Sequence, residues 1–181
     1  MRKAVVRPTG HERTFGEDEI IVSKTDVKGV ITYANQTFSR VSGYSEQELL
    51  GQPHNLIRHP ETPMCVFQLV WDTISQGNEI FGYVSNLCKT GDHYWVFAHV
   101  TPTFDAAGNI TGYHSSRRKP KRSSLDVIQP LYKQLREIEQ AQGDSREGMH
   151  AATAALQDQL TQLNLTYDEF IFSLESDTAN V

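Results

Sequence analysis

The stretch that decides the fold is residues 80–117, IFGYVSNLCKTGDHYWVFAHVTPTFDAAGNITGYHSSR. It contains three runs rich in aromatic and β-branched residues, 80–87, 93–103 and 110–117, separated by the sequences KTGD and DAAGN. Glycine beside aspartate or asparagine at these joints favours tight hairpin turns. Three consecutive strands joined by hairpins predict one antiparallel sheet.

Two further strands are predicted upstream, over residues 20–23 and 29–33, with the turn sequence DVKG between them. Short helices are predicted between the two sets of strands. Asn35 is a helix N-cap, Ser45 with Glu48 three residues later forms a capping box, and residues 64–75 carry apolar side chains at helical spacing. This order predicts an α+β fold, an antiparallel sheet with short helices on one face and a ligand pocket between them.

The C-terminal part differs in composition, with 3 basic and 10 acidic residues from position 125 onward. Apolar residues there alternate spacings of four and three, which indicates helices with heptad character. The members of this predicted seam are Met149, Thr153, Leu156, Leu160, Leu163, Tyr167, Phe170 and Leu174. Such a seam needs a partner helix. A homodimer is the expected partner, and an antiparallel hairpin with the helix that carries Ile128 and Leu135, after a turn near Gly143, is the alternative.

These patterns divide the chain into four parts. Residues 1–18 form an N-terminal cap segment, 19–118 a folded domain, 119–124 a basic linker, and 125–181 a helical tail with a possible coiled coil. The dense basic run RRKPKR at 117–122 is interpreted as an exposed junction, paired with acidic groups of the helices.

Composition excludes several classes of protein. The 181 residues suit one domain plus an appendage, and a net charge of −5 argues against binding nucleic acid or anionic lipid. The two cysteines, Cys65 and Cys88, lack CxxC spacing, which excludes a zinc ribbon and a disulfide scaffold; we expect reduced thiols in a cytoplasm. No metal-ligand spacing, signal peptide or apolar stretch of roughly 20 residues is present, so no membrane span is expected.

Several motifs resemble a known family. YAN at 33–35, VSGY at 41–44 and GDHYW at 91–95 resemble a PAS domain over residues 19–118. GQPHNLIRHPETP at 51–63 resembles, more specifically, the FAD-binding PAS domain of bacterial aerotaxis receptors, as does PLYK just beyond the domain.

The resemblance implies a redox or oxygen sensor that binds FAD, turns over no substrate and passes its redox state to a helical output, a second copy or a chemotaxis-type partner. The implied cofactor-binding residues are Arg58, His59, Trp71, Asn86, Asn35 and Glu61. Two positions depart from the family, which usually has aspartate at Glu61 and often tryptophan at Ile80; neighbouring Phe81 offers another aromatic surface.

Each residue has a chemical reason and a simpler alternative. The Arg58 guanidinium carries paired donors that fit the oxygens of a pyrophosphate group; the alternative is a surface ion pair with Glu61. His59 donates to a flavin or packs against it, and could also ligate heme iron. The Asn86 amide carries the donor and acceptor that a flavin pyrimidine edge requires, or faces outward from its strand.

Trp71 shares a helical face with Phe67 and Ile74, so core packing is the alternative to flavin contact. Asn35 is a helix N-cap first and a pocket residue second. A heme-binding gas sensor, a cofactor-free dimerisation module and a flavin enzyme are the rival functions, the last lacking a substrate-binding constellation. Light-driven adduct chemistry is disfavoured, because residues 55–59 contain no cysteine.

Overall fold

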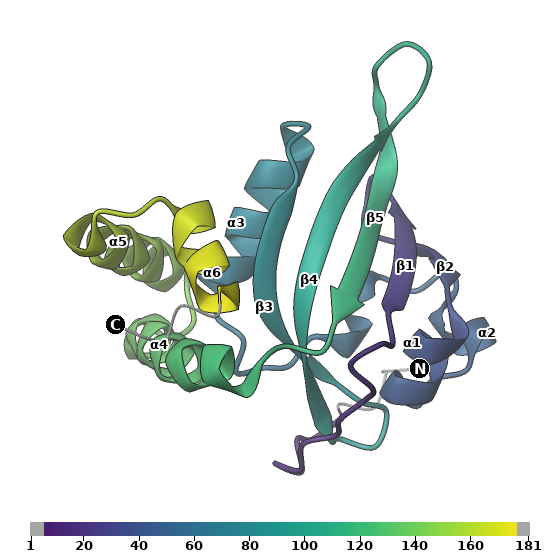
Figure 1. The fold of residues 1–181 in the computed structure, drawn as a ribbon, viewed down its shortest axis with the longest axis horizontal. Coiled ribbons are helices and arrows are strands. Elements are labelled where there is room, and N and C mark those ends of the chain that lie inside the picture. The colour runs from purple at the N-terminus through teal and green to yellow at the C-terminus, as the bar shows by residue number, and fades with distance from the viewer. Residues whose placement is uncertain (1–5, 177–181) are drawn as a thin grey trace.

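The computed structural model describes residues 6–176. Its centre is a five-stranded sheet with the order β2-β1-β5-β4-β3, in which every neighbouring pair is antiparallel (Figure 1). The strands are β1 (Ile21–Asp26), β2 (Ile31–Ala34), β3 (Ile80–Leu87), β4 (His93–Phe104) and β5 (Ile110–Arg118). The predicted antiparallel sheet and α+β fold class are confirmed.

Four short helices follow β2 and return the chain to β3. They are α1 (Gln36–Ser42), α2 (Glu46–Leu49), the 3-10 helix η1 (His54–Ile57) and α3 (Met64–Ser75). The predicted caps are present: Asn35 Oδ1 accepts from the Phe38 amide at 2.9 Å, and Ser45 with Glu48 forms a complete capping box. Gly43 ends α1 at φ 76°, a left-handed conformation that glycine adopts without strain.

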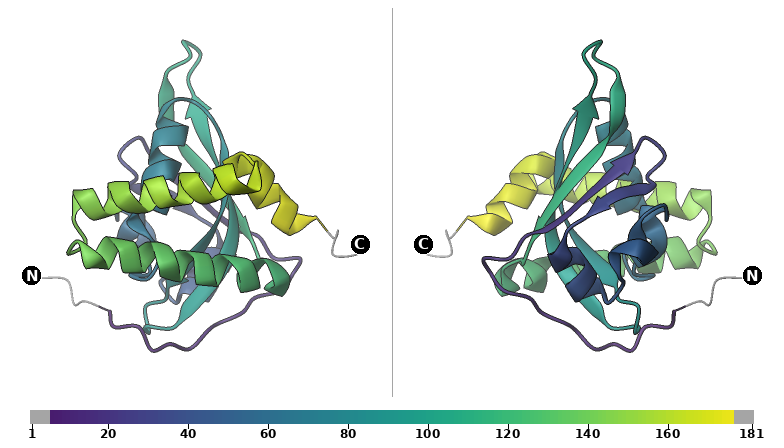
Figure 2. Two further views of the ribbon diagram at one scale, coloured as in Figure 1. Left: turned by 90° about the vertical axis from the view of Figure 1, so that its left-hand side faces the viewer. Right: turned by 90° about the vertical axis from the view of Figure 1, so that its right-hand side faces the viewer.

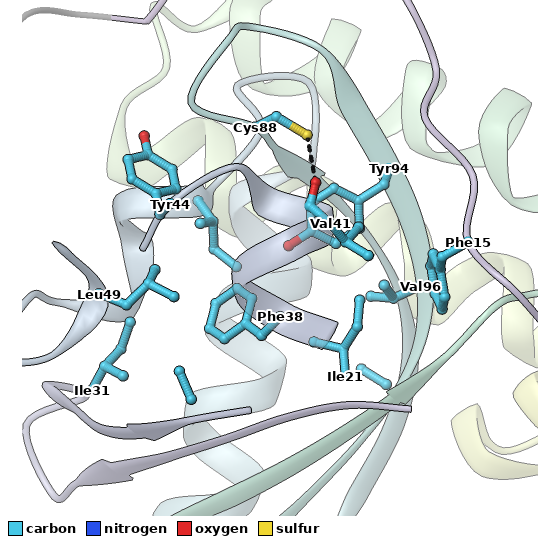
Figure 3. Packing of buried hydrophobic residues seen from close by; sticks show 13 residues of the cluster. Phe15, Ile21, Ile31, Phe38, Val41, Tyr44, Leu49, Cys88, Tyr94 and Val96 are labelled. Atoms are coloured by element: carbon cyan, nitrogen blue, oxygen red, sulfur yellow. Dashed lines mark hydrogen bonds between the residues drawn. The ribbon is translucent and has the colours of Figure 1, made fainter. Parts of the chain in front are cut away.

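The face of the sheet that these helices cover is called here the inner face. Side chains alternate across a strand, and Tyr94, Val96 and Ala98 of β4 all point to this side. They are buried with Ile21 of β1 and Phe38 of α1 in one cluster (Figure 3). The inner face therefore carries the core of the domain.

The tail folds back onto the opposite, outer face. It consists of α4 (Arg122–Ala141), α5 (Arg146–Leu163) and α6 (Tyr167–Glu175). Helices α4 and α5 run antiparallel in front of the sheet (Figure 2, left), after a turn at Gly143. Tyr83 of β3 is buried with Ile128 and Leu156 of these helices. The antiparallel hairpin, the alternative to a dimer, is the arrangement that the structure contains.

The continuous seam predicted from Met149 to Leu174 is wrong, because the helix is interrupted. Asn164 adopts a left-handed conformation (φ 54°) that ends α5, and Thr166 caps the separate helix α6. Leu156 and Phe170 are buried within the chain, whereas Leu163 is 57% exposed. The homodimer remains a prediction, and the buried seam residues Leu156 and Phe170 are not available to a second copy.

The N-terminal segment is attached to the sheet. The Arg13 amide donates to the His93 carbonyl oxygen at 2.7 Å, and Phe15 packs edge-to-face on Tyr94 with ring centres 6.5 Å apart. Acidic residues of this segment pair with the basic run at 119–122, at 3.7 Å for Glu17 with Lys119 and 3.1 Å for Glu12 with Arg122. No helix within residues 6–176 is long and apolar enough to cross a membrane.

Candidate functional site

Arg58 lies where the loop after η1 meets the sheet. Its backbone forms an isolated antiparallel bridge with Asn86 of β3, and its guanidinium carbon lies 4.2 Å from the centre of the Phe67 ring on α3. Burial lowers the pKa of Arg58, and the negative charge of Glu139 in α4 opposes this shift. No ion pair within residues 6–176 joins Arg58 to Glu61. Arg58 is thus held between sheet and helix.

His59 follows directly and is buried, with 4% of its surface exposed. Its Nδ1 accepts from the Glu61 amide at 3.3 Å, and its ring centre lies 5.4 Å from that of His93. Burial lowers the pKa of His59, so the ring is neutral at pH 7. Its Nε2 is buried and has no hydrogen-bond partner among the described residues, which leaves this atom available to a ligand.

Asn86 is buried on the inner face. Tyr83 on the same strand packs against the tail, whereas Val84 packs against the inner-face core; the alternation of β3 therefore turns Asn86 inward. The hypothesis that Asn86 faces outward is wrong. Thr62 Oγ1 donates to the Ser85 carbonyl oxygen at 3.1 Å and fastens the loop beside this strand.

The other three predicted residues lie differently. Asn35 uses its side chain within the fold: Oδ1 accepts from Val22 and Phe38, and Nδ2 donates to the Ile20 carbonyl. The Glu61 side chain is exposed, and only its amide contacts His59.

Trp71 is 40% exposed, which contradicts simple core packing, and its ring meets Tyr113 of β5 edge-on with centres 5.6 Å apart. It lies one helical turn after Phe67, the residue that contacts Arg58. The structure therefore pairs the backbones of Arg58 and Asn86, with His59 next to Arg58 in the chain and Trp71 one helical turn from the Phe67 ring that Arg58 contacts.

Arg117 is the residue that sequence reasoning misplaced. It belongs to the basic run interpreted as an exposed junction, yet only 2% of its surface is exposed, so that interpretation is wrong for this residue. Its Nη2 donates to Ser23 Oγ at 2.6 Å, and its guanidinium carbon lies 4.5 Å from the centre of the Phe38 ring. Burial lowers its pKa to about 10, which leaves it charged at neutral pH.

No carboxylate within residues 6–176 pairs with Arg117, and its Nε and Nη1 have no hydrogen-bond partner there. Burying a charge without a counter-charge or full hydrogen bonding is costly. The alternation of Tyr113, Ser115 and Arg117 along the predicted last strand was the available signal that Arg117 faces the same side as an apolar residue.

Two neutral groups complete this interior cluster. His54 Nε2 lies 3.1 Å from Ser23 Oγ, and loss of solvation together with the Arg117 charge lowers the pKa of His54 to about 3. The Tyr94 hydroxyl is buried and unpartnered among residues 6–176, and burial raises its pKa. The inner face thus offers a fixed cation, unpaired donors and a neutral imidazole, a set that fits a ligand rich in acceptor atoms and negative charge.

Comparison with known proteins agrees with this architecture. Residues 31–117 match the model of the PAS fold family. The chain is 42% identical over 127 residues to the aerotaxis receptor of Escherichia coli and 29% identical over 153 residues to the nitrogen fixation regulatory protein of Klebsiella pneumoniae. These matches cover 70% and 83% of this chain, but the chain spans only 25% and 30% of those proteins.

Solved structures share the fold. The light-state LOV domain of the blue-light photoreceptor aureochrome-1 matches with a TM-score of 0.56 at 23% identity, over 61% of this chain and 88% of that one. A PAS domain from Colwellia psychrerythraea matches with a TM-score of 0.51 at 24% identity, over 55% of this chain and 85% of that one.

Proposed function

The chain contains a PAS domain of the bacterial aerotaxis receptor type, and from this membership we propose that it is a sensor module that binds FAD on the inner face of its sheet. The similar proteins are named as a receptor and a regulator, which supports sensing without substrate turnover. We place the module in the cytoplasm, where Cys65 and Cys88, both free and buried, stay reduced.

The observation that carries the proposal is the buried guanidinium of Arg117 with two unpaired donor nitrogens. A flavin ring offers carbonyl and nitrogen acceptors, and its pyrophosphate carries negative charge, so the donor set fits this cofactor. In our proposal Arg58 holds the pyrophosphate, while Asn86, His59 and Arg117 contact the ring.

The remaining predicted residues have supporting roles in this proposal. Trp71 borders the ligand at the Tyr113 end of the inner face. Asn35 holds the start of α1, and the Glu61 amide fixes the His59 ring by donating to Nδ1. In this proposal Asn35 and Glu61 do not contact the ligand and instead position the residues next to them.

When bound, a flavin supplies reversible uptake of electrons and protons. The residues around it can respond, because the Asn86 amide both donates and accepts, and Nε2 of neutral His59, which carries the ring proton while Nδ1 accepts from the Glu61 amide, can donate a hydrogen bond. A change at Asn86 reaches the tail through β3, whose outer side chains contact α4–α6. The tail then passes the state to a second copy or to a chemotaxis-type partner.

The test is the absorbance spectrum of purified protein, with FAD identified after release by denaturation. We expect a flavin spectrum and FAD as the released cofactor. Release of FMN instead of FAD, or a heme absorbance spectrum, would show that the protein binds one of these rival cofactors instead. Arg58→Ala is expected to weaken FAD binding by about 1.5–3 kcal/mol, as for a charged hydrogen bond. The exposed Arg146→Ala is the control. Colourless protein that takes up no added FAD would refute the proposal.

A further inference from the structure

Helix α3 has no cap of its own. Its N-cap position is Pro63, which makes no side-chain hydrogen bond, and its first turn contains no acidic residue. The first amides of a helix need acceptors from elsewhere. Glu139 of α4 supplies them, since its Oε2 accepts from the Met64 amide at 3.0 Å and its Oε1 from the Cys65 amide at 2.9 Å. The tail, 74 residues later, therefore caps α3.

Glu139 is fully buried where three helices meet. Arg136 Nη1 donates to Glu139 Oε2 at 2.6 Å and to Asp144 Oδ1 at 2.7 Å. Helix α5 packs directly on the same point, because a Cβ built on Gly148 would lie 2.7 Å from the Glu139 carbonyl oxygen. A buried carboxylate at the positive end of a helix, with both of its oxygens hydrogen-bonded, fixes the relative positions of these helices.

The capped end of α3 is also the end of the loop that carries Arg58 and His59. On one side, this loop is fastened to β3 by Thr62 with Ser85 and by the bridge of Arg58 to Asn86. On the other side, it runs into Met64 and the Glu139 carboxylate. The charge of Glu139 also acts on Arg58, opposing the effect of burial on its pKa.

We propose that Glu139 is a positioning residue that couples the tail to the Arg58–His59 loop, so that docking of the tail and filling of the inner-face site stabilise each other through α3. Such coupling is reciprocal: a ligand that orders the loop strengthens the tail contact, and a docked tail raises ligand affinity. The identity of the ligand as FAD rests on the proposed function, whereas the tether itself does not.

Hydrogen exchange of flavin-free protein tests the tether. Glu139→Gln keeps the side-chain size but puts an uncharged amide where both oxygens now accept. We expect exchange at the Met64 and Cys65 amides and in α5 to be about tenfold faster, equivalent to about 1.4 kcal/mol, with β1 and β2 unchanged. Glu139→Asp, which keeps the charge, should restore part of the protection. The exposed Glu137→Gln on the same helix is the control.

Equal exchange in the Glu139 and Glu137 variants would overturn the tether, as would uniform acceleration throughout the sheet. If Glu139→Gln does not fold, the same hydrogen-exchange measurement is made on Glu139→Asp and on its control Glu137→Asp. Faster exchange at Met64, Cys65 and α5 in Glu139→Asp alone would support the tether, and equal exchange in the two variants would overturn it.

Titration with FAD tests the coupling. We expect FAD to slow exchange in α4 and α5 of the wild type, and Glu139→Gln to lower FAD affinity by at least about fivefold, the lower end of typical coupling. A faster-exchanging variant that binds FAD as tightly as the wild type would overturn the coupling. A wild type that binds no FAD would overturn the proposed function, while the flavin-free comparison still decides the tether.

Discussion

At the scale of single residues, the inner face buries the positive charge of Arg117 without a full set of hydrogen-bond partners. Among residues 6–176, the Arg117 guanidinium makes one hydrogen bond, to Ser23, and a cation–π contact with Phe38. Neither replaces the water that a guanidinium loses on burial. The fold therefore carries a cost at this position that a bound acceptor would offset.

Replacing Arg117 by methionine is expected to separate stability from binding. Without flavin, the unfolding free energy should stay equal or rise, because an apolar side chain of similar length removes the buried charge. FAD affinity should fall by about 1.5–3 kcal/mol, the range for a hydrogen bond to a charged group. Chemical denaturation and titration calorimetry measure the two effects, with the exposed Arg118→Met as control. A large loss of stability in Arg117→Met alone would contradict this account.

His54 predicts the pH dependence of stability. Its folded pKa of about 3 lies below its usual value of 6.5, so between these values the unfolded chain binds more protons than the folded one. Stability should therefore rise with pH across this window, and fall on acidification from about 6.5, by up to about 1.4 kcal/mol per pH unit. His54→Gln should flatten this slope in denaturation curves at pH 4 to 7, whereas the exposed His150→Gln should not.

At the scale of elements, local signals predicted most of the fold. The turns, the Asn35 cap and the Ser45 capping box depend on neighbours within a few residues, so the sequence displays them directly. The sequence also contains a local signal for the break between α5 and α6, because Thr166 and Glu169 form a capping box. The heptad spacing hides this signal, since Leu163 and Tyr167 on either side of it are four residues apart and continue the pattern. The periodicity of apolar residues reports only their spacing, so it does not reveal that a single left-handed residue such as Asn164 ends the helix.

The site was less predictable, because its chemistry depends on contacts between distant segments. Arg58 and Asn86 were expected together from a family resemblance, and the chain brings them together through a backbone bridge. Arg117 and Ser23 are 94 residues apart, and Glu139 reaches α3 across 74. No local pattern encodes such pairings, since only strand register and helix docking create them.

The divided tail predicts opposite outcomes for two leucines of the expected seam. Leu156 is buried against the domain, so Leu156→Asp places a charge in an apolar cluster and should destabilise the chain strongly. Leu163 is exposed, and Leu163→Asp should leave stability within about 0.5 kcal/mol, as for surface changes. Thermal unfolding measures both. Dissociation of a wild-type dimer by Leu163→Asp, seen in light scattering, would instead show that this surface binds a second copy.

At the scale of the whole molecule, β3 joins the two faces of the sheet. Asn86 points inward, whereas the Tyr83 hydroxyl donates to Glu175 of α6 at 2.5 Å and the Tyr83 carbonyl accepts from Tyr132 of α4 at 2.6 Å. One strand thus touches both the candidate site and two helices of the tail. A shift of β3 of a few tenths of an ångström would alter contacts on both sides, because packed interiors transmit displacement.

The expected consequence is a tail that differs between redox states. Hydrogen exchange in α4–α6 should change when bound flavin is reduced, because reduction changes the donors and acceptors that Asn86 meets. Asn86→Ala should bind flavin and lose this difference, while the exposed Asn78→Ala, just before β3, should keep it. Identical exchange maps for oxidised and reduced wild type would rule out signalling through the tail.

The two tryptophans of the chain lie on opposite sides of this sheet. Trp71 meets Tyr113 at the inner face, and Trp95 faces Tyr132 of α4 with ring centres 6.0 Å apart. Their indoles are therefore two separate optical reporters. In Trp95→Phe protein, the remaining emission reports on the ligand side, and in Trp71→Phe protein it reports on helix undocking. The order in which the two signals change after rapid mixing reveals the direction in which a disturbance crosses the molecule.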